Sequence, residues 1–165
     1  MVRLAQLDDG TWELARNGER YPIRGAGGPD RYESLAGLGA NSVRTWGISQ
    51  LEPRDAEGRN LLDRAQAQGL SVAVGIWVQQ PRRGFDYSDE KKVAQQRDEI
   101  RAHVRRFRDH PALLVWGLGN EVEISRPAEE YPRIFAELNE LARIVKEEDP
   151  NHPVMTAIAG TNPAK

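Results

Sequence analysis

Short apolar runs alternate with amphipathic stretches along nearly the whole chain. The apolar runs cover residues 21–25, 42–46, 71–78, 113–118 and 154–158. Between them, amphipathic patterns predict helices over residues 30–38, 58–68, 89–109 and 128–148. Strand–helix–strand alternation of this kind predicts parallel strands with right-handed crossovers, so we expect an α/β protein.

Turn and capping residues mark the ends of several of these elements. Asn17 and Gly18 suit the positive φ angles of a type I′ turn, which predicts an N-terminal β-hairpin over residues 10–25. Gly39 and Gly69 stand where a left-handed residue ends a helix.

Two architectures fit five parallel strands. The strand starts lie about 33 residues apart, so eight units would need about 260 residues, close to the ~250 typical of a (β/α)₈ barrel. On this interpretation, residues 1–165 form a single domain, a partial TIM barrel with four βα units and a fifth strand over residues 21–160. The alternative is an open doubly wound sheet, which a chain of this length can complete.

Composition limits the partners of the chain. Its 165 residues include 23 Lys and Arg against 25 Asp and Glu, so no overall positive charge attracts nucleic acid or an anionic membrane. No apolar run approaches the ~20 residues that span a bilayer, and the first residues lack the pattern of a signal peptide. We expect neither a nucleic-acid nor a membrane partner, and the sequence assigns no compartment.

Common motifs for metals, cofactors and covalent catalysis are missing. The chain has no cysteine, which excludes disulfides, thiolate metal sites and cysteine nucleophiles. The glycine run over residues 25–28 fails the dinucleotide-binding spacing because position 30 is Asp. His103, His110 and His152 lack metal-ligand spacing. We expect no metal and no cofactor.

Polar and aromatic residues stand instead at the ends of three predicted strands. An arginine within an apolar strand is costly unless a carboxylate or a ligand satisfies it, and a glutamate directly after a buried strand suits general acid–base catalysis. Each residue alone also fits a structural role, but three strands that converge on one edge favour a site. The residues are Arg44, Trp46, Trp77, Trp116, Asn120, Glu121 and Glu123.

Four segments resemble the (β/α)₈ catalytic domain of retaining glycoside hydrolases, most closely that of family 2. Residues 109–121, with Trp-Gly-Leu-Gly-Asn-Glu at their end, are similar to the fourth-strand signature of that domain. Residues 17–25 and 41–47 resemble its first and second strands, and residues 149–154 its approach to strand five. The resemblance covers nearly the whole chain.

The resemblance implies a role for each matching residue. Glu121 matches the general acid/base, Asn120 the asparagine that contacts the sugar 2-hydroxyl, and Arg44 the arginine near the nucleophile. The loop over residues 84–87 would rim the subsite. Glu123 is the alternative acid, although we expect it to face solvent. The expected floor of the subsite consists of Trp46, Trp77 and Trp116.

Retaining hydrolysis also needs a second carboxyl group, ~5–5.5 Å from the first. In this family the nucleophile is a glutamate at the end of strand seven, and no residue here matches it. We therefore expect a fragment of a catalytic domain that hydrolyses O-glycosides through Glu121 and is inactive by itself. The alternatives are a non-catalytic carbohydrate-binding remnant and an unrelated open-sheet α/β ligand-binding protein.

A partial barrel leaves its first and fifth strands with unpaired edges. The fifth predicted strand, within residues 153–159, is apolar and carries no charge. Besides a carbohydrate substrate, we therefore expect self-association, aggregation or recruitment of a complementing barrel half.

Overall fold

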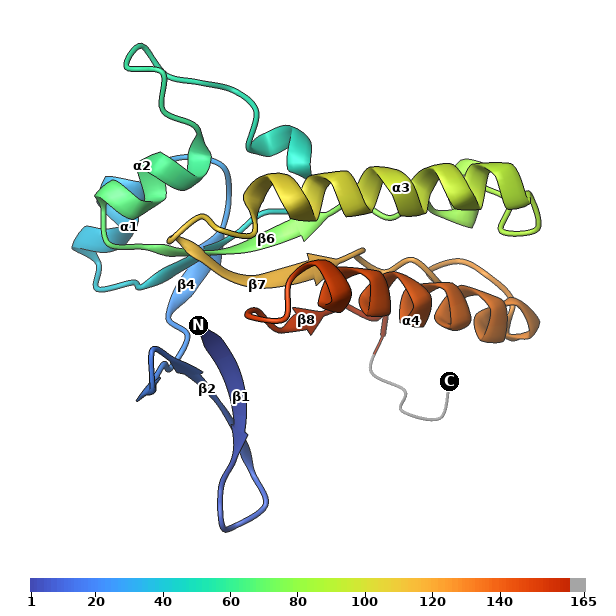
Figure 1. The fold of residues 1–165 in the computed structure, drawn as a ribbon, viewed down its shortest axis with the longest axis horizontal. Helices are drawn as coiled ribbons and strands as arrows, with labels where there is room; N and C mark the ends of the chain where they lie inside the picture. Colours follow the sequence, from blue (N-terminus) through green and yellow to red (C-terminus); the bar gives the residue numbers. More distant parts are fainter. Residues whose placement is uncertain (161–165) are drawn as a thin grey trace.

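A computed structural model describes residues 1–160, which form two β-sheets (Figure 1). The smaller sheet is antiparallel, and the larger sheet is parallel with the order β4-β5-β6-β7-β8. The smaller sheet contains β1 (Val2–Gln6), β2 (Trp12–Arg16) and β3 (Glu19–Arg20). The larger sheet contains β4 (Gly25–Gly27), β5 (Ser42–Arg44), β6 (Ser71–Ile76), β7 (Leu113–Leu118) and β8 (Val154–Met155).

The order of the parallel strands follows the order of the sequence. This confirms the predicted barrel wall, because a doubly wound sheet would reverse direction at a switch point, as in the order 2-1-3-4-5. Over the described residues the wall is not closed. The fold is therefore α/β, with part of a TIM barrel and a separate antiparallel sheet.

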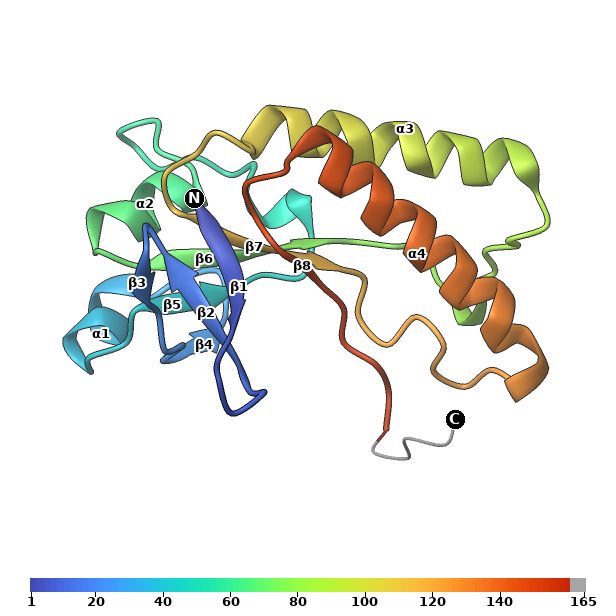
Figure 2. The same cartoon turned by 60° about the horizontal axis from the view of Figure 1, so that its bottom comes forward.

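One α-helix connects each pair of neighbouring parallel strands. Every helix lies within its predicted range, and the two long ones run side by side along one face of the sheet (Figure 2). The helices are α1 (Tyr32–Gly37), α2 (Leu61–Ala67), α3 (Glu90–Phe107) and α4 (Tyr131–Glu148). Three short 3₁₀ helices are also present among residues 1–160: η1 (Ile48–Gln50), η2 (Pro81–Arg83) and η3 (Ala128–Glu130).

Local side-chain bonds explain where two of these helices begin. Asn60 and Asp63 cap α2 reciprocally: Oδ1 of Asn60 accepts from N of Asp63 at 3.0 Å, and Oδ2 of Asp63 accepts from N of Asn60 at 2.9 Å. Oδ1 of Asp89 accepts from N of Lys92 at 3.2 Å at the start of α3. No helix in residues 1–160 is long and apolar enough to cross a bilayer.

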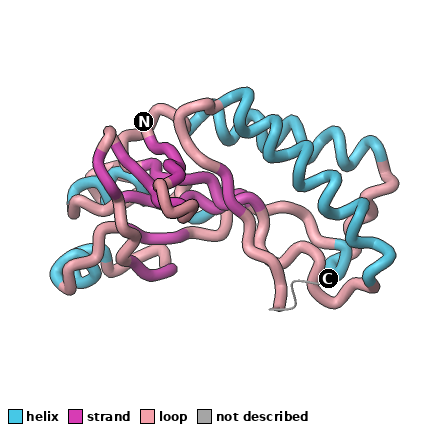
Figure 3. Tube along the Cα trace, turned by 90° about the horizontal axis from the view of Figure 1, so that it is seen from below, coloured by secondary structure: helices cyan, strands magenta, loops and turns pink. Residues whose placement is uncertain are grey.

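The antiparallel sheet covers the N-terminal ends of the parallel strands (Figure 3). Tyr21 Oη donates to Asn41 O at 2.6 Å, Arg16 Nη2 donates to Pro111 O at 2.6 Å, and Val2 N donates to Asn151 O at 2.9 Å. Asn41 directly precedes β5, and Pro111 and Asn151 lie a few residues before β7 and β8, respectively. The hairpin thus leaves the opposite edge of the wall, where the strands end, uncovered.

The predicted hairpin turn is confirmed, but the first parallel strand was placed too early. Asn17 and Gly18 have φ angles of 55° and 87°, as a type I′ turn requires. Residues 21–25 were predicted as the strand, whereas β4 begins only at Gly25. A side chain at Gly25 would place Cβ 2.1 Å from the carbonyl oxygen of Ser42, so pairing at this distance needs glycine. The strand β1 was not predicted.

The main core lies between the parallel sheet and the helices. Asp149, just after α4, accepts a hydrogen bond from Nε1 of Trp116 at 2.8 Å and lies 2.7 Å from Nδ1 of His152. Burial alone would raise the pKa of Asp149, but the bonds from His152 and Trp116 outweigh burial and hold this pKa below its ordinary value. The ionised carboxylate therefore ties the end of α4 to β7. Other buried members of the core include Val72, Val74, Ile76, Leu118, Leu141 and Val145.

The close approach of β5 to β6 gives a first prediction. In Gly75→Ala, the new Cβ would lie 2.4 Å from both Thr45 O and Trp46 Cα, which are backbone atoms that cannot rotate away. Overpacking of this kind costs about 1–3 kcal/mol. We expect a corresponding fall in the free energy of unfolding, measured by urea titration.

Gly37→Ala is the matched control. Its added Cβ meets no atom within 4 Å, and Gly37 is the last residue of α1. Alanine in a helix is favoured over glycine, so stability should rise by roughly 0.5 kcal/mol. A Gly75→Ala protein as stable as the parent would show that the β5–β6 contact is not tight.

Candidate active site

Arg44 and Asn120 meet at the C-terminal rim, the edge of the sheet where the parallel strands end. Arg44 is the last residue of β5, and Asn120 follows β7. Nη2 of Arg44 donates to Oδ1 of Asn120 at 2.9 Å, across the intervening strand β6. Nε of Arg44 is buried and has no hydrogen-bond partner within residues 1–160. An unsatisfied buried donor is costly, so this group is suited to a carboxylate or a ligand.

Glu121 follows Asn120 and is held in an unusual backbone conformation. Its φ is 50°, a left-handed value that costs energy in residues other than glycine and that is common at functional sites. Its backbone N donates to the carbonyl oxygen of Ala157 at 2.8 Å, in the segment after β8. The side chain is half-buried, and its carboxylate accepts no hydrogen bond from the residues described.

Gln80 also contributes to this arrangement, and sequence analysis missed it. It is only 1% exposed, and its Nε2 donates to the carbonyl oxygen of Asn120 at 2.8 Å. Its Oε1 accepts from Nε of Arg82 at 2.7 Å. The loop after β6 is thus tied to the residue before Glu121. A glutamine after an apolar strand carries no distinctive sequence signal, because its partner lies 40 positions away.

Two of the three predicted tryptophans lie at the rim. Trp46 and Trp77 are each 37% exposed. The guanidinium carbon of Arg44 lies 5.9 Å from the ring centroid of Trp46, and that of Arg83 lies 5.2 Å from Trp77. A Cβ at Gly27 would lie 2.5 Å from the Trp46 ring, so the indole covers the end of β4 only because this position is glycine.

The profile described as "Glycosyl hydrolases family 2, TIM barrel domain" matches residues 32–162, most of the chain. The chain belongs to glycosyl hydrolase family 2. The expected fold and the resemblance to family 2 are thereby confirmed, and the open-sheet alternative is excluded. No curated protein matches the chain.

Solved structures share the fold of this family 2 domain. A glycosyl hydrolase family 2 member from Bacteroides cellulosilyticus DSM 14838 is 20% identical with a TM-score of 0.66, over 99% of this chain and 22% of that chain. β-D-Glucuronidase from Dictyoglomus thermophilum is 16% identical with a TM-score of 0.65, over 96% and 29%. An endo-1,4-β-mannanase from Eisenia fetida is 17% identical with a TM-score of 0.65, over 94% and 62%. The chain thus spans about a fifth of the length of the family 2 structure.

Trp116 lies away from the rim of the family 2 domain, so its predicted place in the subsite floor is wrong. It is 0% exposed and packs in the core beneath the helices, with Nε1 bonded to Asp149. It stands in the middle of β7, not at its end, and shares the core with Leu118 two positions on. Side chains of a strand alternate between its faces, so both residues point to the helices.

Glu123 was predicted to face solvent, but the structure buries it. It is 3% exposed, and its Oε1 accepts a hydrogen bond from the backbone N of Ala159 at 2.5 Å. Together with the bond from Glu121 to Ala157, this contact fastens the segment after β8 to the loop after β7. The carboxylate has a structural contact, which makes Glu123 a poor candidate for the acid.

The contact of Glu123 gives a second prediction. In Glu123→Ala, the amide of Ala159 loses its acceptor, and the segment after β8 loses a bond to the loop after β7. We expect faster hydrogen exchange at the amides of Glu121 and Ala159, measured by NMR or mass spectrometry.

Glu123→Gln is the control, because its amide oxygen can accept the same bond. Exchange in this variant should stay close to that of the parent. If Glu123→Ala leaves both amides equally protected, the contact does not hold the loop.

Proposed function

We propose that this chain is the acid/base-bearing part of a retaining family 2 glycoside hydrolase, with Glu121 as the acid/base. The observation that supports the proposal is the Arg44–Asn120 hydrogen bond at the C-terminal rim, because Glu121 directly follows Asn120 in the chain. In the first step, Glu121 would protonate the glycosidic oxygen as the leaving group departs. In the second, its carboxylate would take a proton from the attacking water.

The orientation of the Asn120 amide supports its role in substrate binding. A guanidinium only donates hydrogen bonds, so the Asn120 atom that faces Arg44 is the oxygen. The amide nitrogen is therefore left to donate to a hydroxyl of the substrate, which is what the match to the family's asparagine requires. Trp46 and Trp77 offer exposed rings at the same rim for the apolar face of a sugar.

The nucleophile is the other part of the proposed mechanism. A retaining enzyme holds its second carboxyl ~5–5.5 Å from the first, in this family from strand seven. Glu123 is engaged with Ala159 and does not supply it. We propose that hydrolysis needs a carboxylate from a longer barrel, placed near the unpartnered Nε of Arg44, and that these 165 residues alone have little activity.

The third prediction concerns Glu121→Gln in a length-extended version that contains a strand-seven glutamate. Loss of general acid catalysis should lower kcat/KM about 10²–10⁴-fold for aryl glycosides with poor leaving groups. The loss should be much smaller for 2,4-dinitrophenyl glycosides, whose leaving group needs no proton. Hydrolysis is followed by release of the phenol over a panel of sugars.

Two controls accompany this assay. Glu123→Gln should retain most of the activity, and the chain of 165 residues should show little. An unchanged kcat/KM in Glu121→Gln would show that this residue is not the acid/base. Binding of sugars with no hydrolysis by the extended version would favour the second candidate function, a non-catalytic carbohydrate-binding domain, which the exposed rings of Trp46 and Trp77 also suit.

We further propose that complementing βα units of a family 2 barrel cover the open side of the wall at β8. A largely apolar groove of about 530 Å³ lies there between α4 and β8. Met155 and Ile158 are 38% and 59% exposed, and β8 has one unpaired edge within the described sheet. Such an edge accepts a further strand. The lining of the groove includes Leu118, Phe135, Leu138, Ala142 and Val154.

The fourth prediction tests this proposal by sedimentation velocity. We expect the isolated chain to self-associate or aggregate, and to form a defined complex when it is refolded with a polypeptide that carries the remaining barrel units. Ile158→Lys should reduce self-association, because it puts a charge into the apolar groove beside the edge of β8. A stable, cooperatively melting monomer that does not bind the complementing polypeptide would refute the proposal.

A further inference from the structure

The peptide unit between Asn120 and Glu121 is held at both of its polar atoms. Its carbonyl oxygen accepts from Nε2 of Gln80 at 2.8 Å, and its N–H donates to the carbonyl oxygen of Ala157 at 2.8 Å. Because a peptide unit is planar, two bonds on its opposite edges fix the direction of the whole plane. That plane sets the φ angle of Glu121, which is left-handed at 50°. The position of the proposed acid/base therefore depends on these two bonds.

The side chain of Gln80 is matched to both of its partners. The Asn120 carbonyl only accepts, so the amide nitrogen of Gln80 must face it. Nε of Arg82 only donates, so the amide oxygen, 2.7 Å away, must face that group. Both partners thus select the same orientation of the amide. A methionine has no donor for the Asn120 carbonyl, and an ionised glutamate can keep only the bond from Arg82.

The backbone that carries Gln80 is also held on both sides. N of the preceding residue, Gln79, donates to Oε1 of Gln96 in α3 at 2.8 Å, and its carbonyl oxygen accepts from Oη of Tyr87 at 2.7 Å. Gln80 is only 1% exposed, and Gln96 only 5%. The side chain that reaches Asn120 therefore starts from a fixed position.

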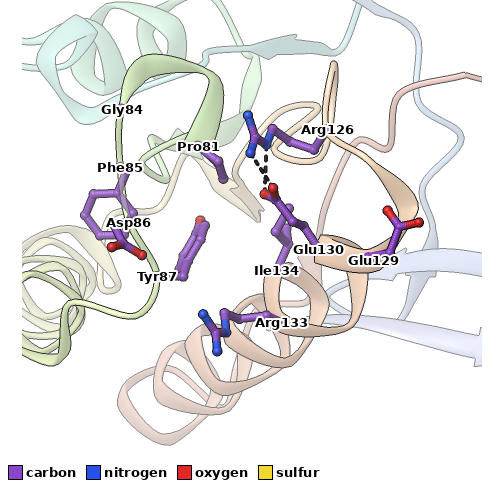
Figure 4. A pocket seen from close by; sticks show the side chains of 10 residues that line it. All are labelled: Pro81, Gly84, Phe85, Asp86, Tyr87, Arg126, Glu129, Glu130, Arg133 and Ile134. Carbon is purple, nitrogen blue, oxygen red and sulfur yellow. Dashed lines mark hydrogen bonds and ion pairs between the residues drawn. The ribbon is translucent and has the colours of Figure 1, made fainter.

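A cavity of about 500 Å³ separates the next part of this loop from the start of α4 (Figure 4). Pro81 and residues 84–87 line one wall, and residues 126–134 supply the other. Figure 4 shows the ring of Tyr87 between the two walls. At this point the bonds of Gln79 and Gln80, rather than close packing against α4, tie the loop to the rim.

We propose that Gln80 is a positioning residue for general acid catalysis, because it holds the Asn120–Glu121 peptide so that the carboxylate of Glu121 meets the leaving oxygen. This inference rests on the proposed function and adds a residue that the resemblance did not assign. Left-handed φ values persist only where the surrounding structure imposes them. Without the bond from Gln80, the peptide can turn and Glu121 can relax to an ordinary φ. The carboxylate then leaves the position from which it gives its proton.

The first test compares leaving groups in the length-extended version that contains a strand-seven glutamate. Gln80→Met should lower kcat/KM about 10- to 100-fold for aryl glycosides with poor leaving groups, since small displacements of a catalytic group have effects of this size. The loss should be much smaller for 2,4-dinitrophenyl glycosides, whose leaving group needs no proton. Gln80→Glu should behave like Gln80→Met, because it keeps the bond from Arg82 but not the bond to Asn120.

Tyr21→Phe is the matched control, because it also removes one side-chain donor from a backbone carbonyl, at the opposite end of the sheet. Its kcat/KM should stay close to that of the parent for both classes of substrate. A role of Gln80 in folding alone would slow both classes equally, and that result would overturn the proposal.

A double variant tests whether Gln80 acts through Glu121. In a Glu121→Gln background, Gln80→Met should cause no further loss of kcat/KM with poor leaving groups, because both changes affect one carboxylate. A further loss as large as the one in the parent would mean that Gln80 acts elsewhere, and would overturn the proposal.

Hydrogen exchange gives a second readout that does not depend on activity. In Gln80→Met of the 165-residue chain, the amide of Glu121 should exchange faster, because a peptide that turns away from Gln80 also withdraws its N–H from Ala157. The amide of Val72, which donates to Ala112 at the other end of the sheet, should keep its protection. Unchanged exchange at Glu121 would contradict the proposal.

The kinetic variants separate this inference from the proposed function. If Glu121→Gln shows the dependence on the leaving group and Gln80→Met does not, Glu121 is the acid/base and the positioning role alone is wrong. If Glu121→Gln itself shows no such dependence, the proposed role of Glu121 is wrong and the positioning role falls with it.

Discussion

The reach of Arg44 across β6 is the constraint on which the rim depends. Neighbouring strands lie ~4.8 Å apart, so a side chain on β5 that bonds to a residue after β7 must cross nearly 10 Å. Ala73 of β6 pairs in register with Arg44, and both residues line the same cavity. The small side chain at this position leaves room for the arginine beside it.

The two ends of the parallel sheet differ: the N-terminal end is covered, and the C-terminal rim carries the candidate site. At the N-terminal end, the hairpin bonds to the backbone before β5, β7 and β8 and covers that end of the sheet. At the C-terminal rim, the left-handed φ of Glu121 and the unpartnered Nε of Arg44 both cost free energy. Such costs persist only where the surrounding structure is firmly held, and the covered end helps to supply that support.

The sequence was sufficient to predict the strands and helices of the wall, but not the face of a strand on which each side chain lies. Helix ranges followed from amphipathic spacing and caps, and the polar residues at the end of β5 and after β7 marked the rim. In contrast, β7 is apolar on both faces, as buried parallel strands are, so nothing in its pattern tells which way Trp116 points. An irregularity between Val72 and Ala73 shifts the register against β7, and this too is invisible in the sequence. The role of Glu123 was missed because its partner, Ala159, is 36 positions away.

The contacts around Asn120 restrict the backbone of this segment far more than they restrict the carboxylate of Glu121. Arg44 fixes the side-chain amide, Gln80 holds the carbonyl oxygen, and Ala157 accepts the next backbone N–H. Within residues 1–160, none of these bonds reaches the carboxylate of Glu121 itself. A residue that first gives a proton to the leaving oxygen and then takes one from water must serve two slightly different positions. A rigid backbone with a carboxylate free to turn meets that requirement, whereas a carboxylate already bonded, like that of Glu123, does not.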